Sequence, residues 1–418
     1  MIKRGIALIF VLLLSLPGIK VSAQQTTDAL DVDCTYAIAV DMDTMQVLYG
    51  KAQDQRLYPA SMTKVLTALT ALDHISDLDD QVTVTLEMLE GLEDGTYTLT
   101  GLINGETITF RDLLNSALLL SGADSCQALA VSLFGSKEAM VDAMNAKAQE
   151  LGMENSHFTN TVGMHDEEHY TNAVDLALLM KAVWANEDLR QAMSTKKMST
   201  AESFYHGEGI ELYNSWAQQM DISQMSSAYV QGGKTGFTPE AGFCFAAVCQ
   251  IQGRRVIVIT AQSDLKYEQG ASLQEAEEIC QYIDEQMVSV RVAEKDETLS
   301  ALKLRNTFHA PIDLKVSEDL YVWVREEQKE DLQVNVDIKK NKAAVQQGEL
   351  LATAEVESDG ETLVSVPIYA QETVESDTAA VVFDSIKAVV FPYGIVIVGV
   401  MICLYGMRRR QQKRKHAL

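Results

Sequence analysis

The spacing of apolar residues changes near Val288, and this change constrains the fold more than any other feature of the sequence. Before it, TYAIAVDMDTMQVLYGK indicates two strands around a turn, and SMTKVLTALTALDHI indicates a helix. Three further strand-like runs, the last of them RRVIVITAQ, precede a closing helix, LQEAEEICQYIDEQM. Strands at both ends of a segment with helices between them favour one antiparallel sheet covered by helices. We therefore predict an α+β domain over residues 24–288.

After Val288 the apolar residues alternate with polar ones, as in LYVWV, LQVNVDI and LVSVPIYA. Leu332, Val334, Val336 and Ile338 are expected to point to one face of a strand. Short alternating strands with charged turns predict a small all-β domain over residues 289–372, followed by a linker at 373–387. This part contains no convincing pair of nucleophile and base, so we interpret it as a spacer or interaction module.

Apolar runs at the two ends predict export and membrane attachment. Lys3 and Arg4 precede an apolar run and small residues at Val21-Ser22-Ala23, the pattern of a signal peptide over residues 1–23. Residues 388–407 carry no charge and would span about 30 Å as a helix, the thickness of a bilayer core. RRRQQKRK follows, which predicts a transmembrane helix with a basic cytoplasmic tail at 408–418. The body is then expected outside the cytoplasm, held at the cell membrane by a single span.

The charge of the chain argues against nucleic acid as a partner. Its formal net charge is −25, and the basic residues cluster only at the ends. The six cysteines include no C-x-x-C pair, so we expect no structural zinc site and interpret most of them as buried thiols.

Ser61 and Lys64, in YPASMTK, form a candidate nucleophile and base at the start of the predicted helix. A serine hydroxyl needs a base to take its proton, and a lysine one turn further along lies on the same face. Burial can lower the pKa of lysine enough for that task, and the helix N-terminus offers N–H groups to an oxyanion. The same spacing recurs at Ser194/Lys197, Ser263/Lys266 and Ser300/Lys303, so the motif alone does not decide.

Two other stretches could complete a pocket around Ser61. SGAD places Ser121 between two apolar helical segments, where a loop could present its hydroxyl. GGKTGFT places Lys234, Thr235 and Gly236 on a strand. Alternation would point Lys234 and Gly236 to one face and Thr235 to the other. The glycines would let the backbone of a substrate lie against this strand.

These three stretches, PASMTK, SGA and KTG, resemble in order and spacing the motifs S-x-x-K, S-x-N and K-T-G. The chain is similar in this respect to the serine-type D-Ala-D-Ala carboxypeptidases, the low-molecular-mass penicillin-binding proteins of peptidase family S11. The flanks GMENSHFTNTVGMHDEEHYTNAVDLALLM and KTGFTPEAGFCF also look like that family. The resemblance covers roughly residues 34–288 and implies a β-lactamase/transpeptidase-like fold.

The resemblance also implies roles for single residues. Ser61 would attack the carbonyl of the D-Ala-D-Ala bond, Lys64 would be the base, and Ser121 would relay protons to the leaving D-alanine. Lys234 and Thr235 would bind the terminal carboxylate, on a strand that includes Gly236. The N–H groups of Ser61 and Phe237 would form the oxyanion hole. The implied partners are peptidoglycan stem peptides and β-lactam antibiotics, without any cofactor.

The second motif departs from the family pattern, because Ala123 stands where the family usually has asparagine. The amide that would hold the acyl part of a substrate is therefore missing. Two alternatives to a carboxypeptidase stay open: a secreted β-lactamase, and a weakly active penicillin-binding scaffold. The extra β domain and the predicted anchor argue against the β-lactamase, whereas Ala123 keeps the scaffold open.

HDEEH places His165 and His169 four residues apart, as in the helix of a zinc peptidase. The glutamate does not follow the first histidine, as H-E-x-x-H requires, and the stretch is expected to be a loop. We therefore expect no metal site.

Overall fold

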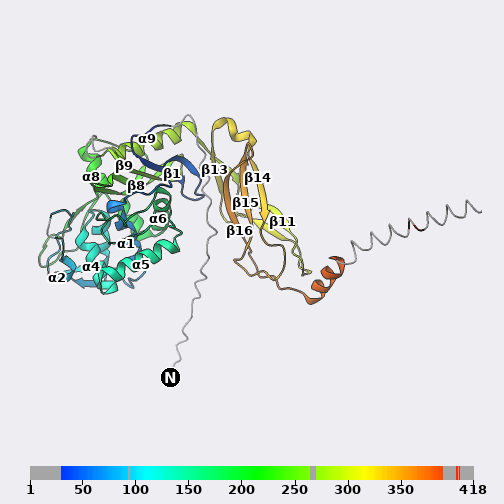
Figure 1. The fold of residues 1–418 in the computed structure, drawn as a ribbon, viewed down its shortest axis with the longest axis horizontal. Coiled ribbons are helices and arrows are strands. Elements are labelled where there is room, and N and C mark those ends of the chain that lie inside the picture. Colours follow the sequence, from blue (N-terminus) through cyan, green and yellow to red (C-terminus); the bar gives the residue numbers. More distant parts are fainter. Residues whose placement is uncertain (1–29, 93–94, 264–269, 389–401, 403, 405–418) are drawn as a thin grey trace, which may run out of the picture. The chain divides into compact units, whose positions relative to one another are not determined.

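The computed structural model describes residues 30–92, 95–263, 270–388, 402 and 404. The chain divides into two compact units (Figure 1), and the first comprises the chain up to Ser289 together with Trp323–Glu326. The second comprises Val290–Val322 and the chain from Glu327 onward. Each unit has its own hydrophobic core.

The first unit contains a five-stranded sheet with the strand order β2-β1-β9-β8-β7. Every neighbouring pair in it is antiparallel, as predicted from strands at both ends of this segment with helices between them. β7 is an edge strand of this sheet, so one side of its backbone is not paired within the sheet. The strands are β1 (Tyr36–Asp41), β2 (Val47–Lys51), β7 (Val230–Thr238), β8 (Gly242–Ile251) and β9 (Arg254–Ser263).

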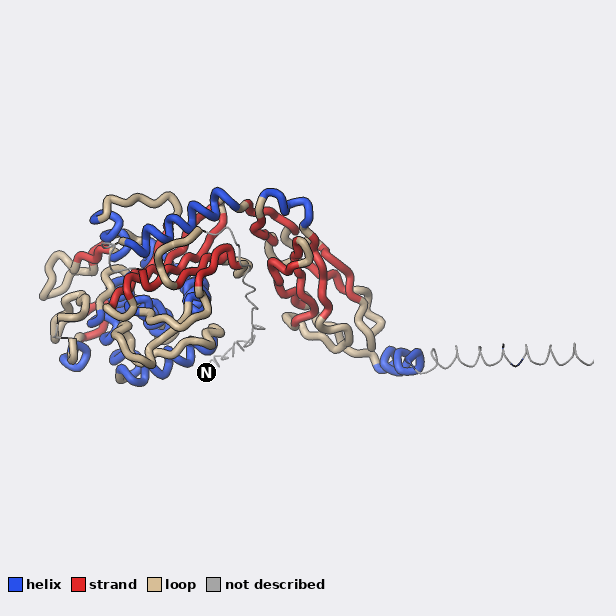
Figure 2. Tube along the Cα trace, turned by 45° about the horizontal axis from the view of Figure 1, so that its top comes forward, coloured by secondary structure: helices blue, strands red, loops and turns tan. Residues whose placement is uncertain are grey.

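Helices cover both faces of this sheet (Figure 2). Helix α9 (Ala271–Gln286) packs on β8 and β9, whereas α6 (Ala173–Ala185) packs on β1, β8 and β9 beside a group of further helices. The other helices are α1 (Thr63–Leu72), α2 (Leu86–Leu89), α3 (Phe110–Leu118), α4 (Ala123–Phe134), α5 (Lys137–Glu150), α7 (Glu187–Ser194) and α8 (Ser215–Ile222). Two small two-stranded antiparallel sheets complete the unit: β3 (Gln81–Thr83) with β4 (Thr107–Thr109), and β5 (Lys197–Ser199) with β6 (Glu211–Tyr213).

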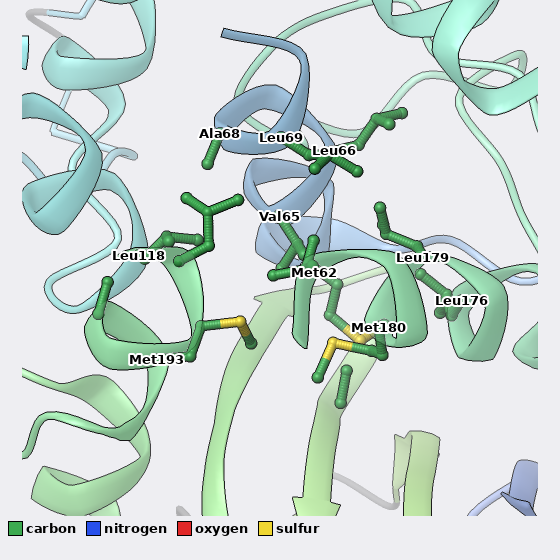
Figure 3. Close-up of a cluster of buried hydrophobic side chains, with 14 of the residues drawn as sticks. Met62, Val65, Leu66, Ala68, Leu69, Leu118, Leu176, Leu179, Met180 and Met193 are labelled. Atoms are coloured by element: carbon green, nitrogen blue, oxygen red, sulfur yellow. The ribbon is translucent and has the colours of Figure 1, made fainter. Parts of the chain in front are cut away.

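Helix α1 lies at the centre of the helical part and contacts α3, α4, α5 and α6. All its residues from Thr63 to Ala71 are buried, which explains why its sequence shows no polar face. Figure 3 shows side chains of α1 packing among leucines and methionines of other helices, with Met62 and Val65 near Met180. The helix that begins beside Ser61 is therefore fixed on all sides by the core.

The second unit is rich in β structure, as the period-two pattern predicted. Its core is made of aliphatic side chains and alanine, among them Leu314, Val345 and Ile368. Val334 and Val336 are half-buried and Ile338 is 44% exposed, so the predicted apolar face of that strand is only partly covered. The elements are β10 (Val288–Ala293), β11 (Thr298–Leu302), β12 (Ile312–Lys315), β13 (Leu320–Val324), η2 (Glu326–Asp331), β14 (Gln333–Ile338), β15 (Leu350–Ser358) and β16 (Glu361–Tyr369).

The predicted signal peptide at 1–23 lies outside the described residues, as does the predicted span at 388–407 except for residues 388, 402 and 404. Within the part of the chain that the structure describes, no helix combines the length and hydropathy needed to cross a membrane. The described cysteines, Cys34, Cys126, Cys244, Cys249 and Cys280, are buried free thiols, as expected from the sequence.

Candidate active site

Ser61 lies in a short 3-10 helix, η1 (Ala60–Met62), which leads directly into α1. Lys64 Nζ donates hydrogen bonds to Ser61 Oγ at 2.8 Å and to the carbonyl oxygen of Val162 at 2.7 Å. The predicted pair is therefore brought together by the first turn of the helix. Ala60, just before the serine, has a φ of 46°, which is strained for a residue with a side chain.

Burial makes Lys64 an unusual lysine. Its side chain is buried, and the loss of solvation lowers its pKa to about 8, although Cys126 and Asp124 oppose part of this shift. A substantial fraction of its amine is therefore neutral near pH 7–8, and a neutral amine can accept the serine proton.

Ser121 occupies the turn between α3 and α4 and is buried. Its φ of 71° places it in the left-handed region, where residues with side chains are rare and often functional. Gly122, rather than Ser121, is the N-cap of α4. Among the described residues, no hydrogen bond joins the hydroxyl of Ser121 to Ser61 or Lys64.

Asp124 ties the turn of Ser121 to a neighbouring loop. Its buried carboxylate accepts hydrogen bonds from the N–H groups of Thr100, Gly101 and Leu102, at 2.8, 2.9 and 3.0 Å. Ala123, beside it, is 1% exposed and packs in a small apolar cluster with Leu92, Ala117, Cys126 and Val162. The position of the usual asparagine is therefore filled by apolar contacts.

Strand β7 forms the opposite wall. Lys234 is fully buried, its Nζ donates to the carbonyl oxygen of Thr235 at 3.0 Å, and burial holds its pKa well below the usual range, with Lys64 adding repulsion. The hydroxyl of Thr235 donates instead to Ser215 Oγ, at 2.6 Å, in the first turn of α8. Lys234 and Thr235 thus point to opposite faces, as alternation predicted.

Gly236 brings this strand against the segment that carries Ser61. A Cβ on Gly236 would lie 3.0 Å from the carbonyl oxygen of Pro59 and 3.1 Å from Ser61 N, so only glycine fits without displacement. Phe237, the next residue, is 48% exposed and stacks on Phe243, with ring centroids 4.7 Å apart. Gly236 and Ser61 are therefore neighbours, and Phe237 is the exposed residue next to them.

A histidine fixes the helix start from behind. His169 Nδ1 accepts a hydrogen bond from Thr159 N at 3.0 Å, so Nε2 carries the proton and donates to Thr63 Oγ1 at 2.7 Å. Burial lowers the pKa of His169 to about 4, which keeps the ring neutral. His165 packs edge-on against Tyr58, with ring centroids 4.6 Å apart. In the described part of the chain, no group of three metal-ligating side chains lies together.

Sequence reasoning missed several residues of this region. The carbonyl of Val162 and the hydroxyl of Ser215 each contact a predicted site residue, and the carboxylate of Asp124 joins the turn of Ser121 to the loop at 100–102. The only available signal was the similarity of the flank around TNTVGM to the family. Two cavities on the described surface, around Arg111 and around Arg190, lie elsewhere and contain none of the predicted residues.

Comparison with known proteins agrees with this geometry. The family model described as D-alanyl-D-alanine carboxypeptidase matches residues 22–264, and that of the penicillin-binding protein 5 C-terminal domain matches residues 289–376. The D-alanyl-D-alanine carboxypeptidase DacF of Bacillus subtilis is 27% identical over 83% of this chain and 87% of its own length. DacB2 of Mycobacterium tuberculosis is 32% identical over 53% of this chain and 72% of its own length.

Solved structures share the fold. Penicillin-binding protein 5 of Haemophilus influenzae superposes with a TM-score of 0.70 over 83% of this chain and 99% of its own, at 20% identity. A mutant of the Streptomyces K15 DD-transpeptidase does so with a TM-score of 0.55 over 61% and 98%, at 26% identity. A serine and a buried lysine in contact, on a transpeptidase-like domain followed by a β-rich one, thus fit the family that the comparisons identify. The chain belongs to the serine D-alanyl-D-alanine carboxypeptidases of peptidase family S11, the low-molecular-mass penicillin-binding proteins.

Proposed function

We propose that this protein removes the terminal D-alanine from peptidoglycan stem peptides through an acyl-enzyme on Ser61. The observation that carries the proposal is the 2.8 Å hydrogen bond between Ser61 Oγ and the buried amine of Lys64. The neutral amine takes the proton of Ser61 while Oγ attacks the carbonyl carbon of the D-Ala-D-Ala bond. Water later hydrolyses the ester and releases the shortened peptide.

The oxyanion that forms in this attack needs donors that are already in place. Backbone N–H groups of Ser61 and Phe237 are the candidates, because Gly236 holds β7 close to Ser61 N. Removing one such donor typically costs about 10²–10³ in rate. Ser121, held in a strained conformation beside the site, is the candidate relay that hands a proton to the leaving D-alanine.

The terminal carboxylate is expected to meet Thr235 and the free edge of β7. Lys234 has no exposed surface and lies near Lys64, so it would support the carboxylate mainly through its charge. An arriving carboxylate favours the charged form of this buried amine. Substrate binding and protonation of Lys234 would then strengthen each other.

The test uses fluorescent penicillin and a stem pentapeptide. The soluble body should be labelled covalently and should shorten the pentapeptide by one alanine, as mass spectrometry would show. Ser61→Ala should fold but take no label. Labelling without any loss of alanine would favour the weakly active scaffold, for which the apolar setting of Ala123 is the supporting observation. Label that persists in Ser61→Ala would overturn the assignment of the nucleophile.

We propose further that the protein is exported and held at the outer side of the cell membrane by the apolar run at 388–407. The support is the sequence alone, an uncharged run followed by RRRQQKRK. A protein shortened to end at Glu375 should stay in the soluble fraction and keep its peptidase activity. Sedimentation of the shortened protein with membranes would require another anchor.

A further inference from the structure

A tight turn at residues 160–164 is held together by one side chain. Asn160 Oδ1 accepts hydrogen bonds from the backbone N–H groups of Val162, Gly163 and Met164, at 3.2, 2.8 and 3.0 Å. Asn160 Nδ2 donates to the carbonyl oxygen of Met164 at 2.9 Å. The amide therefore closes the turn from both ends, and a hydrogen-bonding network of this kind fixes one conformation.

The closed turn contacts both members of the catalytic pair. The carbonyl oxygen of Val162 accepts a hydrogen bond from Lys64 Nζ at 2.7 Å. Gly163, with a φ of 83°, lies so close to the chain before Ser61 that a Cβ on it would be 1.8 Å from the carbonyl oxygen of Ala60. The turn thus touches the base through one residue and the nucleophile segment through the next.

The Val162 carbonyl determines how the neutral amine of Lys64 can point. A neutral amine has two N–H bonds and one lone pair, and a base must aim that lone pair at the proton it accepts. With one N–H directed at Val162, the lone pair can face Ser61 Oγ, where the O–H bond breaks as a new N–H bond forms. The methyl side chain of Ala123 cannot accept a hydrogen bond. Among the described residues, Val162 has the only carbonyl group that accepts a hydrogen bond from Lys64.

We propose that Asn160 is a positioning residue for the catalytic base: it fixes the turn that presents the Val162 carbonyl to Lys64. The proposal rests on the function proposed above for Ser61 and Lys64. Asn160 touches neither of them, and its effect passes through the turn.

Two substitutions separate positioning from charge. Asn160→Ala removes the clamp, so the carbonyl can drift, and a misplacement of about 1 Å can cost on the order of 10²-fold. We expect the acylation rate at high pH to fall by about 10- to 100-fold. Asn160→Asp keeps an acceptor for the three N–H groups but adds a negative charge near the base, which favours protonated Lys64. We expect its pH–rate curve to move upward by about one pH unit.

Asn145 provides a matched control. Its amide also clamps backbone, accepting from Phe158 N at 2.9 Å and donating to the carbonyl oxygen of Phe158 at 2.8 Å, but it does not touch the turn at 160–164. Asn145→Ala and Asn145→Asp should therefore lower thermal stability without changing the pH midpoint of acylation.

The experiment measures the rate of labelling by fluorescent penicillin from pH 5 to pH 10 for the wild type and the four variants, with melting temperatures in parallel. A lower plateau in Asn160→Ala and an upward shift in Asn160→Asp, both absent from the Asn145 pair, support the proposal. If the Asn160 variants lose only stability, as the Asn145 variants do, Asn160 is merely structural and the proposal is overturned. If Asn160→Ala does not fold, the shift in Asn160→Asp decides. A wild type that takes no label would instead contradict the proposed function.

Discussion

The interiors of the two units are built differently. The core of the β-rich unit consists of aliphatic side chains and alanine, such as Leu314 and Leu351. The catalytic unit buries two lysines, Lys64 and Lys234, in addition to its apolar core. Burying an amine without a carboxylate partner costs stability, whereas burying leucine contributes to it. Stability alone explains the residues in the core of the β-rich unit. The two buried lysines of the catalytic unit do not favour stability and are explained by the proposed reaction.

The largest effect should follow from replacing the amine of Lys64 with an apolar group of similar length. Lys64→Met should slow acylation by penicillin by about 10²–10⁴-fold, because it removes the proposed general base. Its free energy of unfolding should stay the same or rise, since a buried amine without a carboxylate partner is removed. Stopped-flow labelling and urea unfolding measure the two quantities. If Lys64→Met lowered both the acylation rate and the free energy of unfolding, the buried lysine would contribute to stability, and the proposed difference between the two interiors would be wrong.

The pH dependence of the wild type sharpens the same point. With a pKa of about 8, Lys64 should give an acylation rate that rises with pH and levels off above about pH 8. The same group affects stability. The pKa of Lys64 in the folded protein lies below its ordinary value of 10.5, so between about pH 8 and pH 10.5 the unfolded chain binds more protons than the folded protein. The contribution of Lys64 to stability should therefore increase from about pH 8 to pH 10.5. Lys64→Met should remove that part of the slope in urea unfolding measured across this range.

Lys234 should matter for turnover more than for folding. Lys234→Ala should lower kcat/KM on a D-Ala-D-Ala peptide by about 100-fold, because the substrate carboxylate loses its buried countercharge. The assay is release of D-alanine. Lys197→Ala, at an exposed lysine paired with Glu211, is the control and should leave kcat/KM within about twofold. If kcat/KM fell equally in the two variants, the loss would come from the change in the overall charge of the protein and not from the buried amine of Lys234.

Leu314→Ala tests the other interior. Leu314 is fully buried, so the truncation should destabilise the β-rich unit by about 2–5 kcal/mol through lost contacts and a cavity. The rate of penicillin labelling should not change. Ile338→Ala, at a 44% exposed side chain, should cost well under this amount. Calorimetry and labelling give both readouts, and a parallel loss of labelling in Leu314→Ala would contradict the separation.

Ala123→Asn should have the smallest effect on activity. In the proposed mechanism Lys234, Thr235 and the edge of β7 hold the substrate, so kcat/KM should stay unchanged or rise by a few-fold. Because Ala123 is buried among apolar side chains, the amide should lower stability by about 1–3 kcal/mol. D-alanine release and melting temperature check the two effects. A large loss of activity without unfolding would show that the small side chain is needed to admit the substrate.

Local patterns predicted the elements and the contact between Ser61 and Lys64, because residues three apart on a helix start are neighbours by geometry alone. They could not predict the Val162 carbonyl, which lies 98 residues from Lys64 and meets it only in the folded chain. Local patterns also could not predict the complete burial of Lys234, since a lysine in a strand is usually exposed. Alternation assigns residues to a strand face but not how far that face is covered: Ile338, at the end of the edge strand β14, is 44% exposed.

The close approach of Gly163 and Gly236 to the backbone around Ser61 limits how this protein could become resistant to β-lactams. A common way to exclude an inhibitor is to add bulk beside the nucleophile. Here a Cβ at Gly163 would clash with Ala60 O at 1.8 Å, and a Cβ at Gly236 would make a tight contact with Ser61 N at 3.1 Å, which requires a small shift of the chain that carries Ser61. Such a change is expected to displace Ser61, the proposed nucleophile, and to lower the natural activity as well. Selection under antibiotic would therefore act at exposed positions further out, where Phe237 is the first candidate.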